Sequence, residues 1–418
     1  MDGFAKSAIL LFLALRAGDV VSLAAGMWFV PRYVLPEDIG AVLPVTSYAT
    51  FLSLPLFALA MTVMKESACL AADGERGKVK SLLCGVFVAV AAILAVMLAL
   101  ASATAHRFLA AMRISDNIAG ILAVSVAFLG CVAPVYTDAL QSLKRFRPLA
   151  AVEAGGAAFR FVAMLVAMPI RALAGYFAGQ AALPAFRIVG SVFALRRDLA
   201  VPSEPFWNRT SVRRIALACL AVLAYQCFPM GAALVEQSVL RTALPASDSA
   251  AYYMVSRFSD FLNYLTFPLL LVMFPYTAAA ARRGGATRPY VVKCATATLA
   301  AAALMAAVFS VWGARLLSLM PHGADYAAYA RFMPCLAVFT ALTTCQVFCT
   351  NAEVSAGRYG FLAWLVPLHV VYPALFALAA SAGRVTSLGQ AVAWFGSASV
   401  LRLAFAAYMV FARRRSVR

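Results

Sequence analysis

The chain has 418 residues, of which 64% are hydrophobic and 12% are charged, and its mean hydropathy is +0.87. These values exclude a large water-soluble domain, because apolar runs of about twenty residues, long enough to cross a bilayer, recur from end to end. A net charge of +18 would suit nucleic acid. The basic residues, however, collect in short loops between the apolar runs, so we expect no nucleic-acid partner.

Hydropathy predicts an all-α polytopic membrane protein of about twelve transmembrane helices. In the first half the predicted helices are 7–30, 40–64, 81–104, 117–142, 149–169 and 172–195. In the second half they are 213–236, 249–276, 291–318, 327–352, 359–381 and 387–412. The first run is interrupted by Arg16 and Asp19 and continues to Phe29, which favours a transmembrane helix over a cleaved signal peptide.

The distribution of Lys and Arg predicts the topology. Of the 35 basic residues, 22 fall on one side of the predicted helices, eight fall on the other side, and five lie within helices. Because cytoplasmic loops carry the excess of basic residues, we expect both termini to be cytoplasmic in a multi-pass protein of the cytoplasmic membrane.

A polar stretch at 196–214 lies near the middle of the chain and is rich in proline and charge. It predicts an N-terminal six-helix bundle at 1–200, a cytoplasmic linker at 201–212 and a C-terminal six-helix bundle at 213–418. A shift of 209 residues sets Val63 and Met64 over Val272 and Met273, a faint internal repeat that agrees with two halves.

The second half contains a distinctive series of features. An acidic residue ends its first helix, and then come a small residue with tyrosine, a Phe-Pro pair and a basic loop containing glycine. These are Glu236, Ala251, Tyr252, Tyr253, Phe274, Pro275 and the loop 282–285. The series resembles the oligosaccharide flippases of polysaccharide biosynthesis, a family of the multidrug/oligosaccharidyl-lipid/polysaccharide exporter superfamily. The loop 35–40 is similar to the Leu-Pro-acidic-Gly turn of that family.

The resemblance implies two six-helix bundles that face each other across a central cavity and work by alternating access. It implies a lipid-linked oligosaccharide as substrate, the inner membrane as location, and membrane lipids and other polysaccharide-assembly proteins as candidate partners. The paired tyrosines followed by Met254 depart from the family pattern, which leaves the identity of the glycan open.

Charged side chains at mid-membrane depth are costly, so they mark candidate functional positions. The candidate diphosphate-binding residues are Arg16, Arg160, Arg257 and Arg402, and the candidate cavity acids are Asp19, Asp138, Glu153, Glu236 and Asp260. Guanidinium suits a diphosphate because its planar fork binds phosphate oxygens at two points. We expect one of the acids to bind a coupling proton or sodium ion.

Structural roles compete with these functional ones. Arg16 with Asp19 and Arg257 with Asp260 are spaced i, i+3, so each pair can neutralise itself. Glu153 and Arg160 share a helix face and can pair. Arg187 lies near a helix end and is expected to extend toward water, whereas Arg402 has no nearby carboxylate and requires an interhelix partner or a cavity role. Pro55 and Pro268 are expected to kink their helices.

Two other functions remain open at this stage. An ion-coupled multidrug and toxin extruder would have the same fold but would present unpaired carboxylates to cationic drugs. A membrane-embedded transferase would need a catalytic Asp or His beside a donor-binding loop, and none is visible. The sequence also carries no hydrolase or nucleotide-binding motif, so we expect neither an enzyme nor a cofactor or metal.

Overall fold

The computed structural model describes residues 18, 20, 24–113, 117–143, 145–196, 200–282, 286–355, 358 and 360–411. The chain divides into two compact units, Met1–Leu234 (unit 1) and Val235–Arg418 (unit 2). Among the described residues the regular secondary structure is entirely helical.

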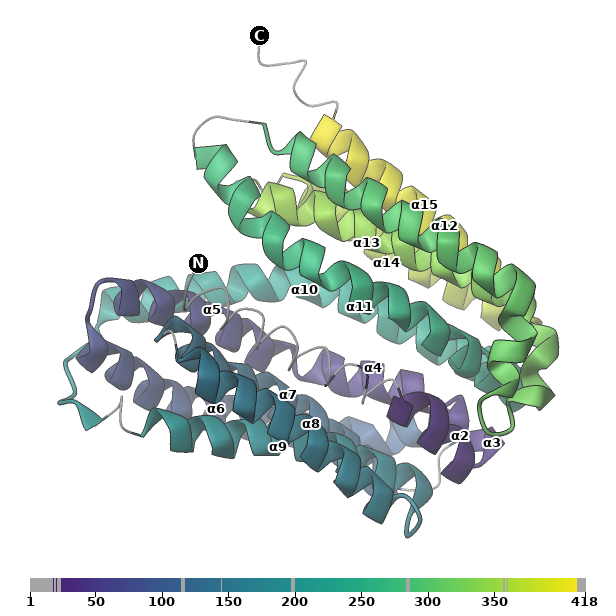
Figure 1. Cartoon of the computed structure of the whole chain (residues 1–418), viewed down its shortest axis with the longest axis horizontal. Helices are drawn as coiled ribbons and strands as arrows, with labels where there is room; N and C mark the ends of the chain where they lie inside the picture. The colour runs from purple at the N-terminus through teal and green to yellow at the C-terminus, as the bar shows by residue number, and fades with distance from the viewer. Residues whose placement is uncertain are drawn as a thin grey trace. The chain divides into compact units, whose positions relative to one another are not determined.

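Unit 1 begins with short helical segments and continues with long helices. Their bounds are η1 Ala25–Phe29, α2 Val30–Tyr33, α3 Pro36–Ile39, α4 Val42–Leu52, α5 Leu54–Ala72, α6 Arg76–Ala111, α7 Asn117–Ser142, α8 Phe146–Ala167 and α9 Ala172–Leu195. Helix α7 packs against α5 and α9, and α8 packs along α9 (Figure 1). Helix α10, Arg209–Ala243, starts in unit 1 and ends in unit 2.

Unit 2 is built around one central helix. Its elements are α11 Ala246–Arg282, α12 Arg288–Ser318, the 3-10 helix η3 Gly323–Phe332, α13 Met333–Ser355, α14 Leu362–Ser381 and α15 Leu388–Phe411. Helix α13 packs against α11, α12 and α15. Phe348 of α13 is fully buried in a cluster with Met273 of α11, Val291 of α12 and Ala406 of α15.

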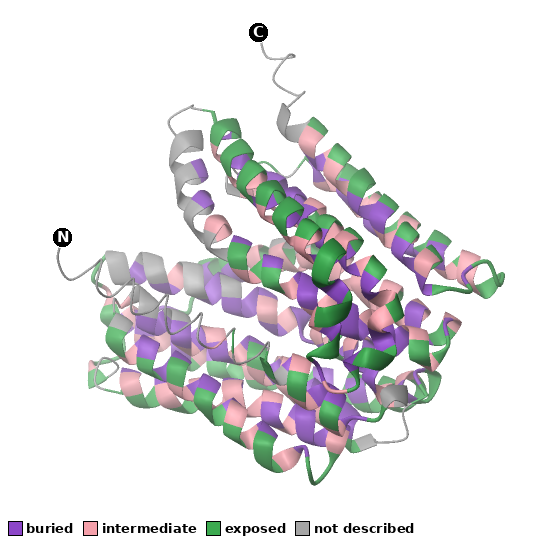
Figure 2. Cartoon of the chain, turned by 45° about the vertical axis from the view of Figure 1, so that its right-hand side comes forward, coloured by how far each residue is buried: buried purple, intermediate pink, exposed green. Residues whose placement is uncertain are grey.

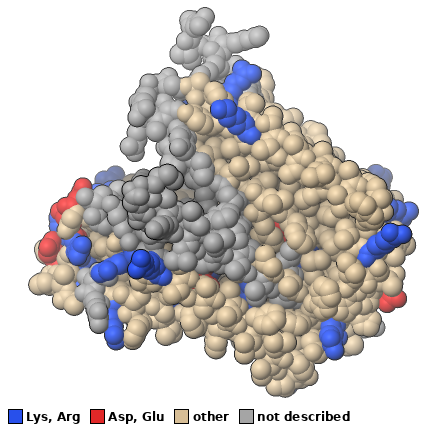
Figure 3. All heavy atoms as spheres, in the orientation of Figure 1, with Lys and Arg blue, Asp and Glu red and all other residues tan. Residues whose placement is uncertain are grey.

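Nine of the described helical segments are long and apolar enough to cross a membrane, and the bent pair α4–α5 makes a tenth. The other two predicted helices are 249–276, which corresponds to α11, and 7–30, of which the structure describes only residues 18, 20 and 24–30. Buried and exposed residues form stripes along the helices (Figure 2), and charged side chains cover little of the surface in view (Figure 3). Exposed side chains such as Val88, Ile170 and Val311 suit contact with lipid. The predicted all-α polytopic membrane fold is confirmed.

The predicted helix 40–64 differs from the structure, because it is two helices that meet at Ser53 with a bend of 57°. Pro55 follows the break and has no N–H to donate to Phe51, so the helical hydrogen bonds are interrupted there. Helix α11, in contrast, runs through position 268 without a break. The predicted helix 327–352 also differs, since it starts as η3 and becomes α-helical at Met333.

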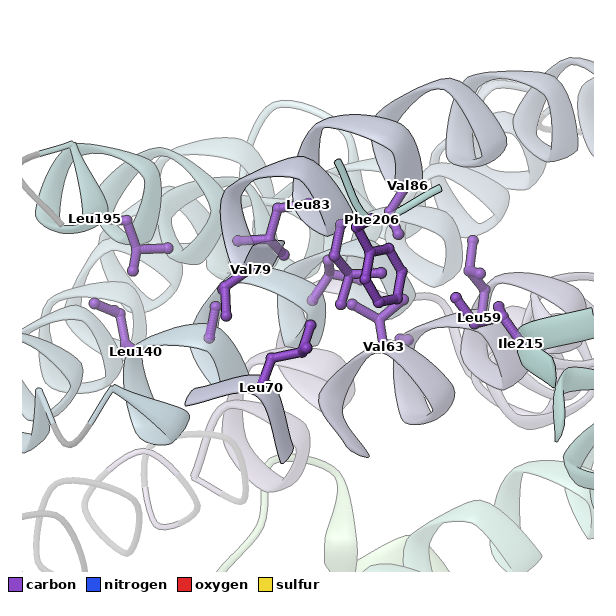
Figure 4. Close-up of a cluster of buried hydrophobic side chains, with 14 of the residues drawn as sticks. Leu59, Val63, Leu70, Val79, Leu83, Val86, Leu140, Leu195, Phe206 and Ile215 are labelled. Carbon is purple, nitrogen blue, oxygen red and sulfur yellow. The ribbon is translucent and has the colours of Figure 1, made fainter. Parts of the chain in front are cut away.

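The linker and the first part of α10 pack into unit 1. Phe206 of the linker and Ile215 of α10 are buried in one cluster with Leu59 and Val63 of α5 and Val86 of α6 (Figure 4). Contacts therefore divide the units within α10, between Leu234 and Val235, later in the chain than the predicted linker 201–212. The prediction of two six-helix bundles stays a prediction, because it concerns the number of helices in each half of the chain and not the division of packing contacts.

Candidate functional site: charged side chains inside the two units

Arg257 and Asp260 lie one turn apart on α11. The Nη1 atom of Arg257 is 3.0 Å from Oδ2 of Asp260, and the two side chains are 22% and 28% exposed. The guanidinium carbon of Arg257 also lies 4.9 Å from the centre of the Tyr253 ring. The local pairing that the i, i+3 spacing predicted is therefore present, and the ring gives the cation a second favourable contact.

A second ion pair joins two helices of unit 2. Arg402 of α15 donates from Nη2 to Oε1 of Glu236 on α10 over 2.7 Å, and both side chains are largely buried. Arg402 was expected to have either an interhelix partner or a cavity role, and the structure shows an interhelix partner. The sequence could not identify that partner, because Glu236 lies 166 residues earlier in the chain.

Two further polar residues lie within electrostatic range of these pairs. Tyr252 of α11 interacts with the charges of Glu236, Arg257 and Asp260. His369 of α14 interacts with the charge of Arg402, and its Nδ1 atom lies 2.8 Å from the Leu365 carbonyl oxygen. We call this group the unit 2 polar cluster, and its members are Glu236, Tyr252, Arg257, Asp260, His369 and Arg402.

Unit 1 contains an ion pair that the sequence interpretation missed. Glu153 of α8 accepts a hydrogen bond from Nη2 of Arg187 on α9, and 30% of the Arg187 side chain is exposed. Arg187 had been expected to extend toward water. The distance of each residue from the α8–α9 turn could have indicated the pair. Glu153 lies 14 residues before the end of α8, and Arg187 lies 15 residues after the start of α9. Residues at matching distances from a helical turn lie at similar depth.

Arg160, which we had expected to pair with Glu153, makes a different contact in the structure. It is buried on α8 and donates from Nη2 to the carbonyl oxygen of Gly18 over 2.9 Å. This hydrogen bond connects a residue of the predicted first helix to α8.

The remaining predicted site residues are Arg16, Asp19 and Asp138. Arg16 and Asp19 lie outside the described residues, and Asp138 lies on α7 but its side chain is not described. Their roles stay predictions.

Asp248 plays a structural role at the start of α11 that the sequence interpretation did not single out. Tyr329 of η3 donates its hydroxyl proton to Oδ1 over 2.6 Å, and the backbone N–H of Leu388 at the start of α15 lies 3.4 Å from Oδ2. One carboxylate thereby connects three elements, and its negative charge suits the N-terminal ends of both α11 and α15.

The chemistry available at depth is dominated by guanidinium. Three of the described carboxylates, Glu153, Glu236 and Asp260, are each bound to an arginine. The Nε–H groups of Arg187 and Arg402 are buried and have no hydrogen-bond partner among the described residues.

No family model matches the chain, and no curated protein matches it at the threshold applied. Solved structures do match over nearly the whole length. A multidrug resistance MATE family transporter of the MOP superfamily, in an inward-facing conformation, has a TM-score of 0.68 at 14% identity, with 98% of this chain and 99% of that chain covered.

Two other solved structures extend the comparison. The lipid II flippase MurJ has a TM-score of 0.60 at 10% identity, with 97% of this chain and 87% of that one covered. A MOP superfamily transporter from Pyrococcus furiosus, described as having a binding pocket of reverse polarity that suggests a different function, has a TM-score of 0.64 at 15% identity, with 98% and 96% covered. The chain therefore has the fold of the MOP superfamily transporters.

Proposed function

We propose that this protein is a flippase that moves a lipid-linked oligosaccharide, with an isoprenoid diphosphate anchor, across the cytoplasmic membrane by alternating access. The transported glycan would supply the biosynthesis of a cell-surface polysaccharide. In this proposal both termini are cytoplasmic, and a proton or sodium gradient drives the cycle.

The observation that carries the proposal is the pairing of carboxylates with arginines inside both units. A carboxylate would neutralise the charge of a cationic drug, yet Glu153, Glu236 and Asp260 are each bound to an arginine. A guanidinium has five N–H donors and keeps donors in reserve after it binds one carboxylate oxygen. The interior charges are thus better suited to a diphosphate than to a cation.

Two of the solved structures support this proposal. One solved structure of the same fold is named a lipid II flippase, and another transporter of this fold is described as having reverse polarity in its binding pocket. The fold therefore accommodates lipid-linked substrates and more than one pocket polarity.

An ion-coupled multidrug and toxin extruder is the second candidate. It is favoured by the higher TM-score to a MATE transporter, 0.68, than to the flippase, 0.60. For this function an acid such as Asp260 would have to release its arginine before it could bind the drug. We therefore favour the flippase.

Transport in proteoliposomes tests the role of Arg257. A fluorescent undecaprenyl-diphosphate oligosaccharide is incorporated, and its movement between leaflets is followed with a membrane-impermeant quencher. The variants are Arg257→Ala, the double variant Arg257→Ala with Asp260→Ala, and Arg384→Ala. Arg384 is an exposed arginine between α14 and α15 and provides the matched control.

If Arg257 binds the diphosphate, transport is lost in the single and the double variant and is retained in Arg384→Ala. The double variant is decisive, because it removes both charges and leaves no buried charge uncompensated. Recovery of transport in the double variant would show that the pair is only structural and would contradict the assigned role of Arg257.

A further inference from the structure

An open groove of about 510 Å³ runs between the first part of α8 and the last part of α9, and neither Glu153 nor Arg187 is among its lining residues. Its walls include Ala151, Val152, Phe186, Gly190 and Phe193, and Arg196 lies at one end. The volume is in the range of sites that hold a single small ligand. The groove is thus a shaped, mostly apolar surface with a single charged end.

The groove faces outward from unit 1. Ala151 and Phe193 are exposed, whereas Glu153 and Arg160, which make the interior contacts of α8, are buried. Positions 151 and 193 therefore lie on the helix faces turned away from the packed interior. In a membrane-spanning hairpin of this kind, an exposed apolar face is in contact with acyl chains.

The two walls of the groove meet closely at Gly190 of α9. A Cβ atom at Gly190 would stand 3.0 Å from Cγ2 of Val152, closer than ordinary packing allows. Glycine at this position therefore lets α8 and α9 approach closely.

The charged end is arranged to bind an anion. Arg196 follows the last residue of α9 and is exposed, and its guanidinium carbon lies 3.9 Å from the centre of the Phe193 ring. The ring orients the guanidinium beside the groove through a cation–π contact, which uses none of its N–H donors. Arg145 and Arg147, both exposed at the start of α8, add positive charge where the chain enters the same helical hairpin.

We propose that this groove binds one anionic phospholipid of the surrounding bilayer. An acyl chain lies against the apolar walls, and the phosphate binds the guanidinium of Arg196. Basic pockets between transmembrane helices recognise anionic headgroups in this way. Arg196 lies at the end of the hairpin that faces the side rich in basic residues, which we expect to be the cytoplasmic side. The site lies in unit 1, whereas the transport test of the proposed function changes Arg257 of unit 2.

Native mass spectrometry of the detergent-purified full chain tests the proposal. The probes are phosphatidylglycerol, phosphatidylcholine with the same acyl chains, inorganic phosphate, and undecaprenyl diphosphate as a competitor. The variants are Arg196→Gln, which removes the charge, and Ala151→Phe, which fills the groove from its exposed side. Arg171→Gln changes an exposed arginine at the opposite end of α9 and is the matched control.

We expect one phosphatidylglycerol to be retained in preference to phosphatidylcholine, and we expect inorganic phosphate not to displace it. Retention should fall about fivefold in Arg196→Gln, the contribution of one basic residue near an anionic headgroup. It should also fall in Ala151→Phe and remain unchanged in Arg171→Gln. Because Ala151 is exposed, its substitution leaves folding intact and keeps the test valid should Arg196→Gln be unstable.

Three results would overturn the proposal. Equal retention of the two phospholipids would mean that the headgroup charge is not recognised. An equal loss in Arg171→Gln would indicate general surface attraction. Displacement of phosphatidylglycerol by an equal concentration of undecaprenyl diphosphate would assign the groove to the lipid tail of a transport substrate.

Discussion

At the scale of single residues, substitutions in the Arg402–Glu236 pair test whether this ion pair stabilises unit 2. Arg402→Met leaves the Glu236 carboxylate buried without its partner, and such losses cost about 3–5 kcal/mol. We expect a marked fall in the thermal unfolding temperature of the detergent-solubilised protein. Adding Glu236→Gln to Arg402→Met should recover most of the loss, because no buried charge then remains. A double variant as unstable as Arg402→Met would contradict this account.

The charged residues also show how far the sequence predicts a site. Arg257 and Asp260 could be paired from spacing alone, because residues three apart on a helix share a face. Arg402 and Glu236 could not be paired, since 166 residues separate them and only tertiary packing brings α10 and α15 together. Glu153 and Arg187 were an intermediate case. Both residues lie at similar distances from the turn between α8 and α9, which predicts that they have a similar depth in the membrane. It does not predict which face of each helix contacts the other helix.

At the scale of elements, the linker is held on the start of α6 by specific contacts. Lys80 donates from Nζ to the Val201 carbonyl oxygen over 2.9 Å, and the indole N–H of Trp207 donates to the Ser81 carbonyl oxygen over 2.8 Å. The backbone N–H of Glu204 bonds the Gly77 carbonyl oxygen over 3.2 Å. These contacts join residues more than a hundred positions apart and anchor the linker to unit 1.

Gly85 is required for this anchoring, because a Cβ atom there would stand 2.0 Å from Nε1 of Trp207. We expect Gly85→Ala to displace Trp207 and to speed proteolytic cleavage within 200–208, measured by limited proteolysis of the purified protein. Gly130→Ala is the matched control, because a Cβ atom at Gly130 would have no neighbour within 4 Å. Equal cleavage rates in both variants and the wild type would show that the tryptophan contact does not hold the linker.

Most helices of the structure were predictable from hydropathy, and the differences have local physical causes. The break at Ser53 follows from Pro55, which removes a helical hydrogen bond, although its position and the bend of 57° required the structure. Helices α6, α10 and α11 are 36, 35 and 37 residues long, longer than predicted. Hydropathy detects only the apolar part of a helix, whereas backbone hydrogen bonding continues into its polar ends.

At the scale of the whole molecule, the distribution of basic residues makes a prediction about topology. A phosphatase that is active only outside the cytoplasm, fused after Arg384 between α14 and α15, should be active. The same enzyme fused after Phe411 at the end of α15 should be inactive, whereas a fluorescent protein at that point should fluoresce. The opposite pattern would place the C-terminus outside the cytoplasm and reverse the predicted orientation.

The central proposal is that arginine-paired acids suit this protein to an anionic lipid-linked substrate and make it unsuited to a cationic drug. The most direct test uses wild-type protein in proteoliposomes with proton and sodium gradients. Transport of an undecaprenyl-diphosphate oligosaccharide and of a cationic dye is measured in the same preparation. The account predicts that the oligosaccharide lipid changes leaflet and the dye is not transported. Gradient-driven transport of the dye, with the oligosaccharide lipid remaining in its original leaflet, would contradict it.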